Sequence, residues 1–234
     1  MTDGEARRPR VGVVVPAAGS GRRMGGVKKP FLELAGEPVL ARALRPFLTD
    51  ARVVSIVVAL PPDDEEGPPA WLTALDPRIR VTAGGATRTE SVRAGIARLE
   101  DDLDVIAVHD AARPFVTAEV VARCLDIASG GVGAVAGTPA VDTLKRVDAD
   151  GLIVETPPRA AMWHAQTPQV FPAEILRRAY ADGAGEGTDD AALVEALGTP
   201  VRMVDAGPGN FKVTRPDDLV VAEAVLSRAA RQAP

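Results

Sequence analysis

Short apolar runs alternate with helically spaced apolar residues along the first part of the chain. The runs are mostly β-branched and continuous, and they occupy residues 11–15, 53–59, 79–81, 105–108 and 132–136. Between them, apolar residues at helical spacing occupy residues 38–47, 92–99 and 116–128. Buried strands that alternate with helices are typical of parallel sheets with right-handed crossovers. The pattern therefore predicts an α/β fold with a doubly wound, mostly parallel sheet.

A different pattern begins after Pro139. Residues 144–147 and 152–155 are strand-like segments on either side of the polar turn 148–151, which predicts a β-hairpin. A lone two-stranded hairpin is only marginally stable in water. This arm, at about residues 139–160, therefore needs a partner surface, either in its own domain or in another subunit.

Together, these segments fit one domain over residues 11–234, with the hairpin arm as part of it. A polar tail at residues 1–10 precedes the domain and is expected to be disordered. The acidic, proline-rich stretch 63–69 is expected to be a solvated loop. Beyond the hairpin, the pattern predicts helices at 172–181, 189–197 and 216–230 and a strand at 201–204.

The first predicted strand leads into a glycine-rich loop with much positive charge. Gly19 and Gly21 follow the strand, and four cations come shortly afterwards: Arg22, Arg23, Lys28 and Lys29. Main-chain N–H groups freed by glycine, together with converging cations, suit a polyanion such as a triphosphate. The alternative is an ordinary glycine turn between a strand and a helix, which does not need so much positive charge.

Two familiar phosphate-binding motifs do not match this loop. The G-x-G-x-x-G motif of dinucleotide-binding folds would need glycine where Met24 stands, and the second strand leads to Pro61 instead of an acidic residue. The P-loop pattern G-x-x-x-x-G-K-[ST] occurs nowhere in the sequence. A nicotinamide-dependent oxidoreductase is therefore disfavoured.

Composition narrows the class of protein. The chain has 234 residues, 46% hydrophobic and only 3% aromatic, so a core of Val, Leu, Ile and Ala is expected. The net charge of −5 argues against a general nucleic-acid binder but allows a local basic pocket. The single cysteine, Cys124, lies on an apolar stripe and excludes an internal disulfide. With no signal peptide and no apolar run of membrane-spanning length, the protein is expected to be cytoplasmic.

A second candidate site lies at residues 108–114, where a predicted strand ends. Open α/β sheets bind ligands at the carboxyl ends of their parallel strands. Asp110 in this segment can hold Mg²⁺, which prefers oxygen ligands and substrate phosphates, and Arg113 can clamp a phosphate with two hydrogen bonds. These residues leave open the alternative of a helix-capping Asp110 that pairs with Arg113.

Three further segments carry a signal only in combination. Gly84 and Gly85 let a ligand approach the main chain, and Ser91 offers a hydroxyl to a base edge, although a turn and a capped helix would also explain this segment. Residues 188–190 are equally well a helix N-cap. Lys212 stands at a strand end, where a lysine is more often a solvated charge than a ligand.

His109 and His164 are the only histidines in the sequence. They cannot build a nucleophilic triad or a histidine metal site. That absence fits a reaction in which a phosphate monoester attacks a phosphoanhydride, because the phosphate is already ionised near neutral pH. Catalysis then depends on positioning and on charge stabilisation.

Together these segments resemble one enzyme family, the 2-C-methyl-D-erythritol 4-phosphate cytidylyltransferases of the non-mevalonate isoprenoid pathway. The resemblance extends from residue 11 to the closing helix and implies a Rossmann-like nucleotidyltransferase fold. The motifs that carry it, in the family's order, are Pro16-Ala17-Ala18-Gly19-x-Gly21-x-Arg23-Met24, Gly84-Gly85-x-x-Arg88-x-x-Ser91-Val92, His109-Asp110-Ala111-Ala112-Arg113-Pro114, Asp142-Thr143-x-Lys145, Trp163-His164-Ala165-x-Thr167-Pro168-Gln169 and Lys212-Val213-Thr214-Arg215-Pro216-x-Asp218-Leu219.

The resemblance implies transfer of CMP from CTP to 2-C-methyl-D-erythritol 4-phosphate, with release of pyrophosphate and with Mg²⁺ bound at Asp110. The residues implied to bind CTP are Ala17, Ala18, Gly19, Gly85, Ser91 and Asp110. Those implied to bind the methylerythritol phosphate are Arg113, Thr143, Arg159, Thr167 and Lys212. Those implied to be catalytic are Arg23, Lys29, Arg159 and Lys212.

The resemblance also implies a homodimer, in which the hairpin arm lends Thr143 and Arg159 to the neighbouring subunit's site, and no nucleic-acid or membrane partner. Three positions depart from the family's usual pattern. Lys28 precedes the lysine and Pro30 follows it, so Lys29 is chosen for its spacing to Phe31 while Lys28 stays open. Position 86 is alanine where the family is often acidic, and position 166 is Gln where it often has leucine.

Two other functions remain as alternatives. A sister cytidylyltransferase that uses ribitol 5-phosphate shares the fold, the CTP loop and the chemistry, and differs only in the pocket for the alcohol phosphate. Asp142, Thr143 and Arg159 favour methylerythritol phosphate. A non-catalytic nucleotide sensor on the same fold is disfavoured because the cations and Asp110 are present together.

Overall fold

A seven-stranded sheet forms the centre of the molecule in a computed structural model that describes residues 7–19, 31–181 and 187–232. From one edge to the other, the strands are β11 (Val201–Asp205), β7 (Gly133–Pro139), β10 (Trp163–Pro172), β6 (Val105–Val108), β1 (Val11–Pro16), β4 (Val53–Leu60) and β5 (Ile79–Ala83). The strands β1, β4, β5 and β6 run parallel to one another, and β11 runs parallel to β7. Strand β10 is antiparallel to both β6 and β7, so the sheet is mixed but mostly parallel.

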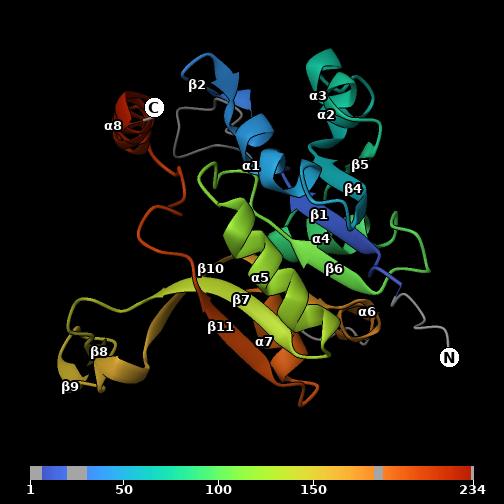
Figure 1. Ribbon diagram of the computed structural model, residues 1–234. Helices are drawn as coiled ribbons and strands as arrows, with labels where there is room; N and C mark the ends of the chain where they lie inside the picture. The colour runs from blue at the N-terminus through green and yellow to red at the C-terminus, as the bar shows by residue number, and fades with distance from the viewer. Residues whose placement is uncertain (1–6, 20–30, 182–186, 233–234) are drawn as a thin grey trace, which may run out of the picture.

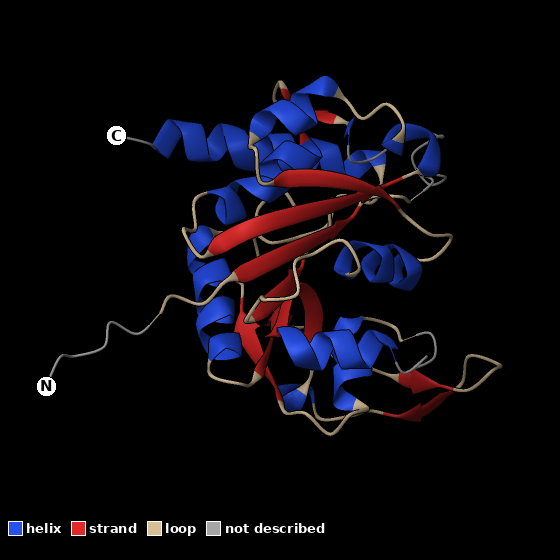
Figure 2. Cartoon of the chain, turned by 90° about the vertical axis from the view of Figure 1, so that its right-hand side faces the viewer, coloured by secondary structure: helices blue, strands red, loops and turns tan. Residues whose placement is uncertain are grey.

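Helices cover both faces of the sheet, which confirms the predicted doubly wound α/β fold (Figures 1 and 2). These helices are α1 (Val39–Leu48), α4 (Arg88–Ile96), α5 (Ala118–Ser129), α6 (Ala173–Ala181) and α7 (Asp190–Glu195). Successive side chains of a strand point to opposite faces. In β1, Val13 and Val15 pack with α1 and α5, whereas Val14 packs with α4, α6 and α7.

Strand β10 is the main element that the sequence pattern did not predict. It pairs with β7 at Trp163–Ala165 and again at Gln169, with a shift of register between the two stretches. Pro168 lies within this irregular stretch. Proline cannot donate a ladder hydrogen bond and is tolerated in strands only at edges and bulges, so a proline-containing run does not look like a central strand in sequence.

The stretch 63–69 is only partly the loop that was expected. Residues Pro62–Glu65 form the short helix α2, and α3 follows at Ala70–Leu75. The physical reason lies in the sequence itself, since proline is favoured in the first helical turn and acidic side chains there interact well with the helix dipole. The other predicted helices and strands differ from the observed ones at their ends. For example, α5 begins at Ala118 because the Thr117 side chain accepts a hydrogen bond from Val120 N.

The predicted hairpin forms an arm that projects from the body of the molecule (Figure 1). It contains β8 (Arg146–Val147), β9 (Ile153–Glu155) and the 3₁₀ helix η3 (Arg159–Ala161). Several of its apolar side chains are exposed: Val147, Leu152, Ile153 and Val154. Such an exposed apolar arm fits the expectation that it needs a partner surface.

The two ends of the described chain are attached differently. Arg7 and Arg10, within the predicted tail 1–10, both bond to Asp104, at 2.7 Å and 2.6 Å. At the other end, the closing helix α8 (Pro216–Gln232) packs near a small hairpin of β2 (Glu33–Leu34) and β3 (Glu37–Pro38). Within the described ranges, no helix has the length and hydrophobicity needed to cross a membrane.

Candidate functional site

The loops that follow β1 and β5, two of those that the sequence predicts to bind a ligand, lie together at the carboxyl ends of β1, β4 and β5. Gly84 donates its N–H to the carbonyl of Leu60, at the end of β4, at 2.7 Å. A Cβ atom at Gly84 would lie only 2.4 Å from the Cβ of Ala18, so glycine is required for the two loops to approach this closely. Ala17 is buried, whereas Gly19 is exposed. The loops that start at Ala17 and at Gly84 therefore lie side by side.

Two side chains of α4 hold the second of these loops in place. The Ser91 hydroxyl accepts a hydrogen bond from Gly85 N at 3.1 Å and donates one to the Thr87 carbonyl at 2.9 Å. The Glu90 carboxylate accepts hydrogen bonds from Ala86 N and Thr87 N, at 2.6 Å and 3.2 Å, as part of a capping box. The capped helix that was one interpretation of this segment is thus present. Contact between Ser91 and a base stays a prediction.

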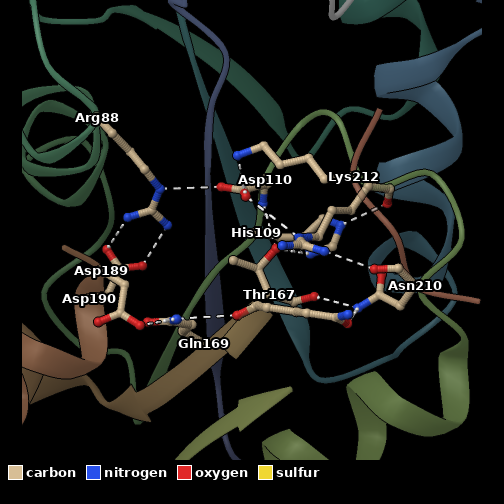
Figure 3. Close-up of polar contacts among 11 residues, drawn as sticks. Arg88, His109, Asp110, Thr167, Gln169, Asp189, Asp190, Asn210 and Lys212 are labelled. Carbon is tan, nitrogen blue, oxygen red and sulfur yellow. Dashed lines mark hydrogen bonds and ion pairs between the residues drawn. The ribbon is translucent and has the colours of Figure 1, made fainter. Parts of the chain in front are cut away.

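Asp110, just after β6, lies at the centre of a cluster of cations (Figure 3). Its Oδ2 lies 2.8 Å from Lys212 Nζ, its Oδ1 lies 3.2 Å from Arg88 Nε, and Arg113 Nε lies 3.6 Å from Oδ2. Burial alone would raise the pKa of Asp110, but Lys212, Arg88 and Arg113 outweigh it and hold the pKa well below its ordinary value. Asp110 is therefore ionised at neutral pH, and Lys212 is an ion-pair partner instead of a fully solvated charge.

A chain of buried hydrogen bonds fixes the backbone around Asp110. The Thr167 hydroxyl accepts a hydrogen bond from Asp110 N at 2.9 Å. The Arg113 carbonyl, 3.2 Å from His109 Nε2, can only accept, so Nε2 carries the hydrogen of the neutral imidazole. His109 Nδ1 therefore accepts a hydrogen bond from the Thr167 hydroxyl, at 3.1 Å. Burial lowers the pKa of His109 to about 4, which keeps the imidazole neutral. His109 therefore acts here as a structural group.

Asn210 connects these buried hydrogen bonds to the segment that carries Lys212. Arg113 Nη1 donates to the Asn210 carbonyl at 2.8 Å, and Asn210 Nδ2 donates to the Thr167 carbonyl at 2.9 Å. Further on, Val213 N donates to the Ala112 carbonyl at 2.8 Å. These bonds on both sides of Lys212 explain how its side chain reaches Asp110, although the two residues are far apart in sequence.

The structure thus brings together part of the predicted substrate site and leaves another part elsewhere. Arg113, Thr167 and Lys212 all lie around Asp110. Arg23 and Lys29, like the alternative Lys28, lie outside the described residues.

Thr143 and Arg159 belong to the arm, which points away from the sheet (Figure 1). Both are exposed, and Arg159 Nη1 donates to the Val141 carbonyl, within the arm, at 2.6 Å. In a single chain the arm therefore keeps these two side chains on its own surface, so their place in a shared site stays a prediction.

The sequence analysis missed the part of the site that lies on the far side of Arg88. Arg88 bridges Asp110 and Asp190, and Asp190 is completely buried. Two features of the sequence could have indicated this part of the site. Arg88 belongs to the motif that begins at Gly84, and Asp190 belongs to the segment 188–190. That segment was interpreted as an N-cap, which holds for Asp189.

Asp110 is also the predicted Mg²⁺ ligand. The described parts of the chain hold no group of three or more His, Cys, Asp or Glu residues that could bind a metal. A single ionised carboxylate still fits Mg²⁺, which commonly binds through one or two carboxylates together with substrate phosphates and water. The carboxylate of Asp110 therefore suits an ion that arrives with a nucleotide.

Comparison with known proteins gives a consistent result over almost the whole chain. The family model of 2-C-methyl-D-erythritol 4-phosphate cytidylyltransferase matches residues 11–228. A protein of that name from Symbiobacterium thermophilum is 45% identical over 226 residues, which cover 95% of each chain.

Solved structures agree with this match. The crystal structure of the enzyme of that name from Thermus thermophilus is 37% identical, with a TM-score of 0.78, and covers 93% of this chain and 99% of that one. The 4-diphosphocytidyl-2C-methyl-D-erythritol synthase from Anaerococcus prevotii has a TM-score of 0.84 at 27% identity, over 94% of this chain and 97% of that one. By sequence and by fold, the chain belongs to the family of 2-C-methyl-D-erythritol 4-phosphate cytidylyltransferases.

Proposed function

We propose that this cytidylyltransferase works by in-line attack of the phosphate of 2-C-methyl-D-erythritol 4-phosphate on the α-phosphorus of CTP. A bond forms between a phosphate oxygen and the α-phosphorus, and the bond from the α-phosphorus to the oxygen that bridges to the β-phosphate breaks. Pyrophosphate leaves, and 4-diphosphocytidyl-2-C-methyl-D-erythritol is formed. The observation that supports this mechanism best is the cluster of three cations around Asp110 beside two glycine loops.

In this proposal the main chain of the two adjacent loops seats the CTP. Gly19 leaves room for close approach of phosphate, sugar or base, and backbone N–H groups are suited to an anion. Gly85 offers its main chain, and a Cβ there would lie only 2.2 Å from the Glu90 Cβ. Ala17 and Ala18 contribute main chain, and Ser91 keeps the loop around Gly85 in shape. Asp110, at the adjoining strand end, meets the ribose and the metal region.

The methylerythritol phosphate binds on the other side of Asp110. Arg113 and Lys212 supply positive charge there, and Thr167 holds the loop that carries Asp110 and Arg113. A phosphate monoester is ionised near neutral pH, so no side chain needs to remove a proton from it. Positioning and electrostatic stabilisation then account for the catalysis.

The proposal includes Mg²⁺ at Asp110 and a homodimer formed through the arm. When bound, Mg²⁺ neutralises phosphate charge and so supports attack at phosphorus. The exposed apolar residues of the arm favour its burial against a second subunit, which would receive Thr143 and Arg159 at its site.

A substrate panel tests the proposed function. Pyrophosphate release from CTP is expected only when methylerythritol phosphate and Mg²⁺ are both present. The measurement is a coupled pyrophosphate assay with methylerythritol phosphate, ribitol 5-phosphate or no acceptor, each with CTP and with the other nucleoside triphosphates. Equal release with ribitol 5-phosphate would favour the sister enzyme, and no turnover with any polyol phosphate would favour a nucleotide sensor.

The glycine-rich and basic segment of the sequence that follows β1 supplies a second prediction. Arg23→Ala and Lys29→Ala are each expected to lower kcat by about 10²-fold, as does the loss of one donor that stabilises transition-state charge. Steady-state kinetics at saturating CTP and methylerythritol phosphate measure the effect. Lys28→Ala is the matched variant, and it decides between the two adjacent lysines. If kcat stays near the wild-type value in both Arg23→Ala and Lys29→Ala, the assigned role is wrong.

A further inference from the structure

Arg88 divides its guanidinium between two carboxylates (Figure 3). Its Nη1 and Nη2 bind the two oxygens of Asp190, at 3.0 Å and 2.7 Å, and its Nε reaches Asp110 Oδ1 at 3.2 Å. The paired contact to Asp190 is the short, bidentate one, and the contact to Asp110 is single and longer. Arg88 is therefore anchored on Asp190 and directs only one N–H to Asp110.

Asp190 is itself held rigidly. It is completely buried, and the Tyr180 hydroxyl donates to its Oδ1. The start of α7, which carries Asp190, is fastened to β10 by Gln169, whose Oε1 accepts from Ala191 N at 2.8 Å and whose Nε2 donates to Asp189 at 2.9 Å. A carboxylate in such a place must be paired with a cation, so Asp190 fixes the position of Arg88.

This arrangement decides which oxygen of Asp110 faces which cation. Arg88 takes Oδ1, so Oδ2 remains for Lys212 at 2.8 Å. If Arg88 were released from Asp190, its planar guanidinium could rotate and bind both oxygens of Asp110, because bidentate pairing with a carboxylate is its preferred geometry. Lys212 would then lose its partner oxygen, and the carboxylate would rotate.

We propose that Arg88 and Asp190 are positioning residues that set the orientation of Asp110 and so keep the Asp110–Lys212 pair in place for the reaction. The inference rests on the proposed function only in that it gives Asp110 and Lys212 a role in turnover. It adds a pair outside the substrate-contacting residues, which acts through Asp110. Burial by itself would lower the pKa of Arg88, but Asp190 and Asp110 outweigh it and raise the pKa, so the arginine stays charged.

The pair could instead serve only to fasten α4 to α7, and the choice of variants separates the two roles. Asp190→Asn keeps the shape of the side chain but removes the charge that anchors Arg88. Arg88→Lys keeps the positive charge but removes the planar guanidinium that binds two carboxylates. Arg93 is the matched control on the same helix. Its Nε donates to the Tyr180 carbonyl at 3.3 Å and so ties α4 to α6, and it bonds to no member of the Asp110 cluster among the described residues.

The test is steady-state kinetics of pyrophosphate release for Asp190→Asn, Arg88→Lys and Arg93→Lys, with urea unfolding of each. For the first two variants we expect kcat to fall about 10-fold to 100-fold while the KM of each substrate changes less than about 3-fold, because a small misplacement of reacting groups lowers the rate of the bound complex. Arg93→Lys should keep the wild-type kcat. Arg88→Ala should regain part of its activity when guanidinium is added, whereas a purely structural loss would not respond in this way.

The result that overturns the proposal is a wild-type kcat in folded Asp190→Asn and Arg88→Lys, or a loss of activity that follows only the unfolded fraction. A loss of kcat/KM that comes only from a higher KM would also overturn the proposal, since it indicates weaker substrate binding instead of misplaced reacting groups. Turnover by the wild-type enzyme in the same assay checks the proposed function separately. If the wild-type enzyme and both variants release pyrophosphate equally fast, the positioning role is wrong but the proposed function is not affected.

Discussion

Lys212→Ala is expected to lower kcat/KM by about 10³-fold, the largest effect of any single substitution among the described residues. Lys212 Nζ lies 2.8 Å from Asp110 Oδ2 and is the most exposed cation of the cluster, with 40% of its side chain accessible. It is therefore the cation best placed to reach an incoming phosphate. In the proposed mechanism its loss removes charge stabilisation at phosphorus, and it also leaves Asp110 with only its two arginine partners.

The measurement is kcat/KM for methylerythritol phosphate, with CTP and Mg²⁺ saturating. Lys212→Arg keeps the positive charge and should retain part of the activity, although its fork differs in shape from an ammonium group. Arg215→Ala removes an exposed cation from the same segment, three residues further on, and should leave kcat/KM within about twofold of wild type because exposed charges on the surface contribute little. A Lys212→Ala enzyme with nearly normal kcat/KM would show that this lysine has no part in the reaction.

Mixing two inactive variants is expected to restore activity. In the proposed dimer each site combines Lys29 of one subunit with Arg159 from the arm of the other. A heterodimer of Lys29→Ala and Arg159→Ala protomers therefore has one intact site and one doubly altered site. If the subunits assort at random, about half of the dimers are heterodimers, and the mixture should reach about one quarter of wild-type activity.

A second mixture is the matched control. When a protomer that carries both Lys29→Ala and Arg159→Ala pairs with a wild-type protomer, a shared site predicts that neither site of the heterodimer is intact. A site built within one chain predicts instead that the wild-type protomer stays active. Activity is measured after refolding from a common denatured pool, with heterodimers verified by differently tagged protomers. No recovery in verified heterodimers of the first mixture would argue against a shared site.

The strands and helices on the amino-terminal side were predictable because their patterns are local. β1, β4 and β6 are nearly continuous apolar runs, as strands buried on both faces must be. β10 was not predictable in this way. Trp163, His164 and Ala165 are exposed or polar at its start, and Pro168 interrupts its pattern. Only pairing with β6 and β7 on both sides makes this segment a central strand.

The candidate site likewise has features that the local sequence predicts and contacts that only the fold explains. The sequence by itself indicated which residue types are candidates for the chemistry: glycine loops for main-chain contact with an anion, Asp110 at a strand end, and cations at Arg113 and Lys212. These features are local in sequence, and their order along the chain is enough to indicate the family.

Only the tertiary structure decided how those residues pair. Lys212 and Asp110, and likewise Arg88 and Asp190, lie 102 residues apart in sequence, so neither contact belongs to any local pattern. Both contacts follow from burial, because a carboxylate removed from water has to be met by a cation from whichever segment the fold brings near it. Whether Lys212 is a solvated charge or the partner of Asp110 is therefore a property of the packed sheet and its neighbouring loops, and not of the residues on either side of it.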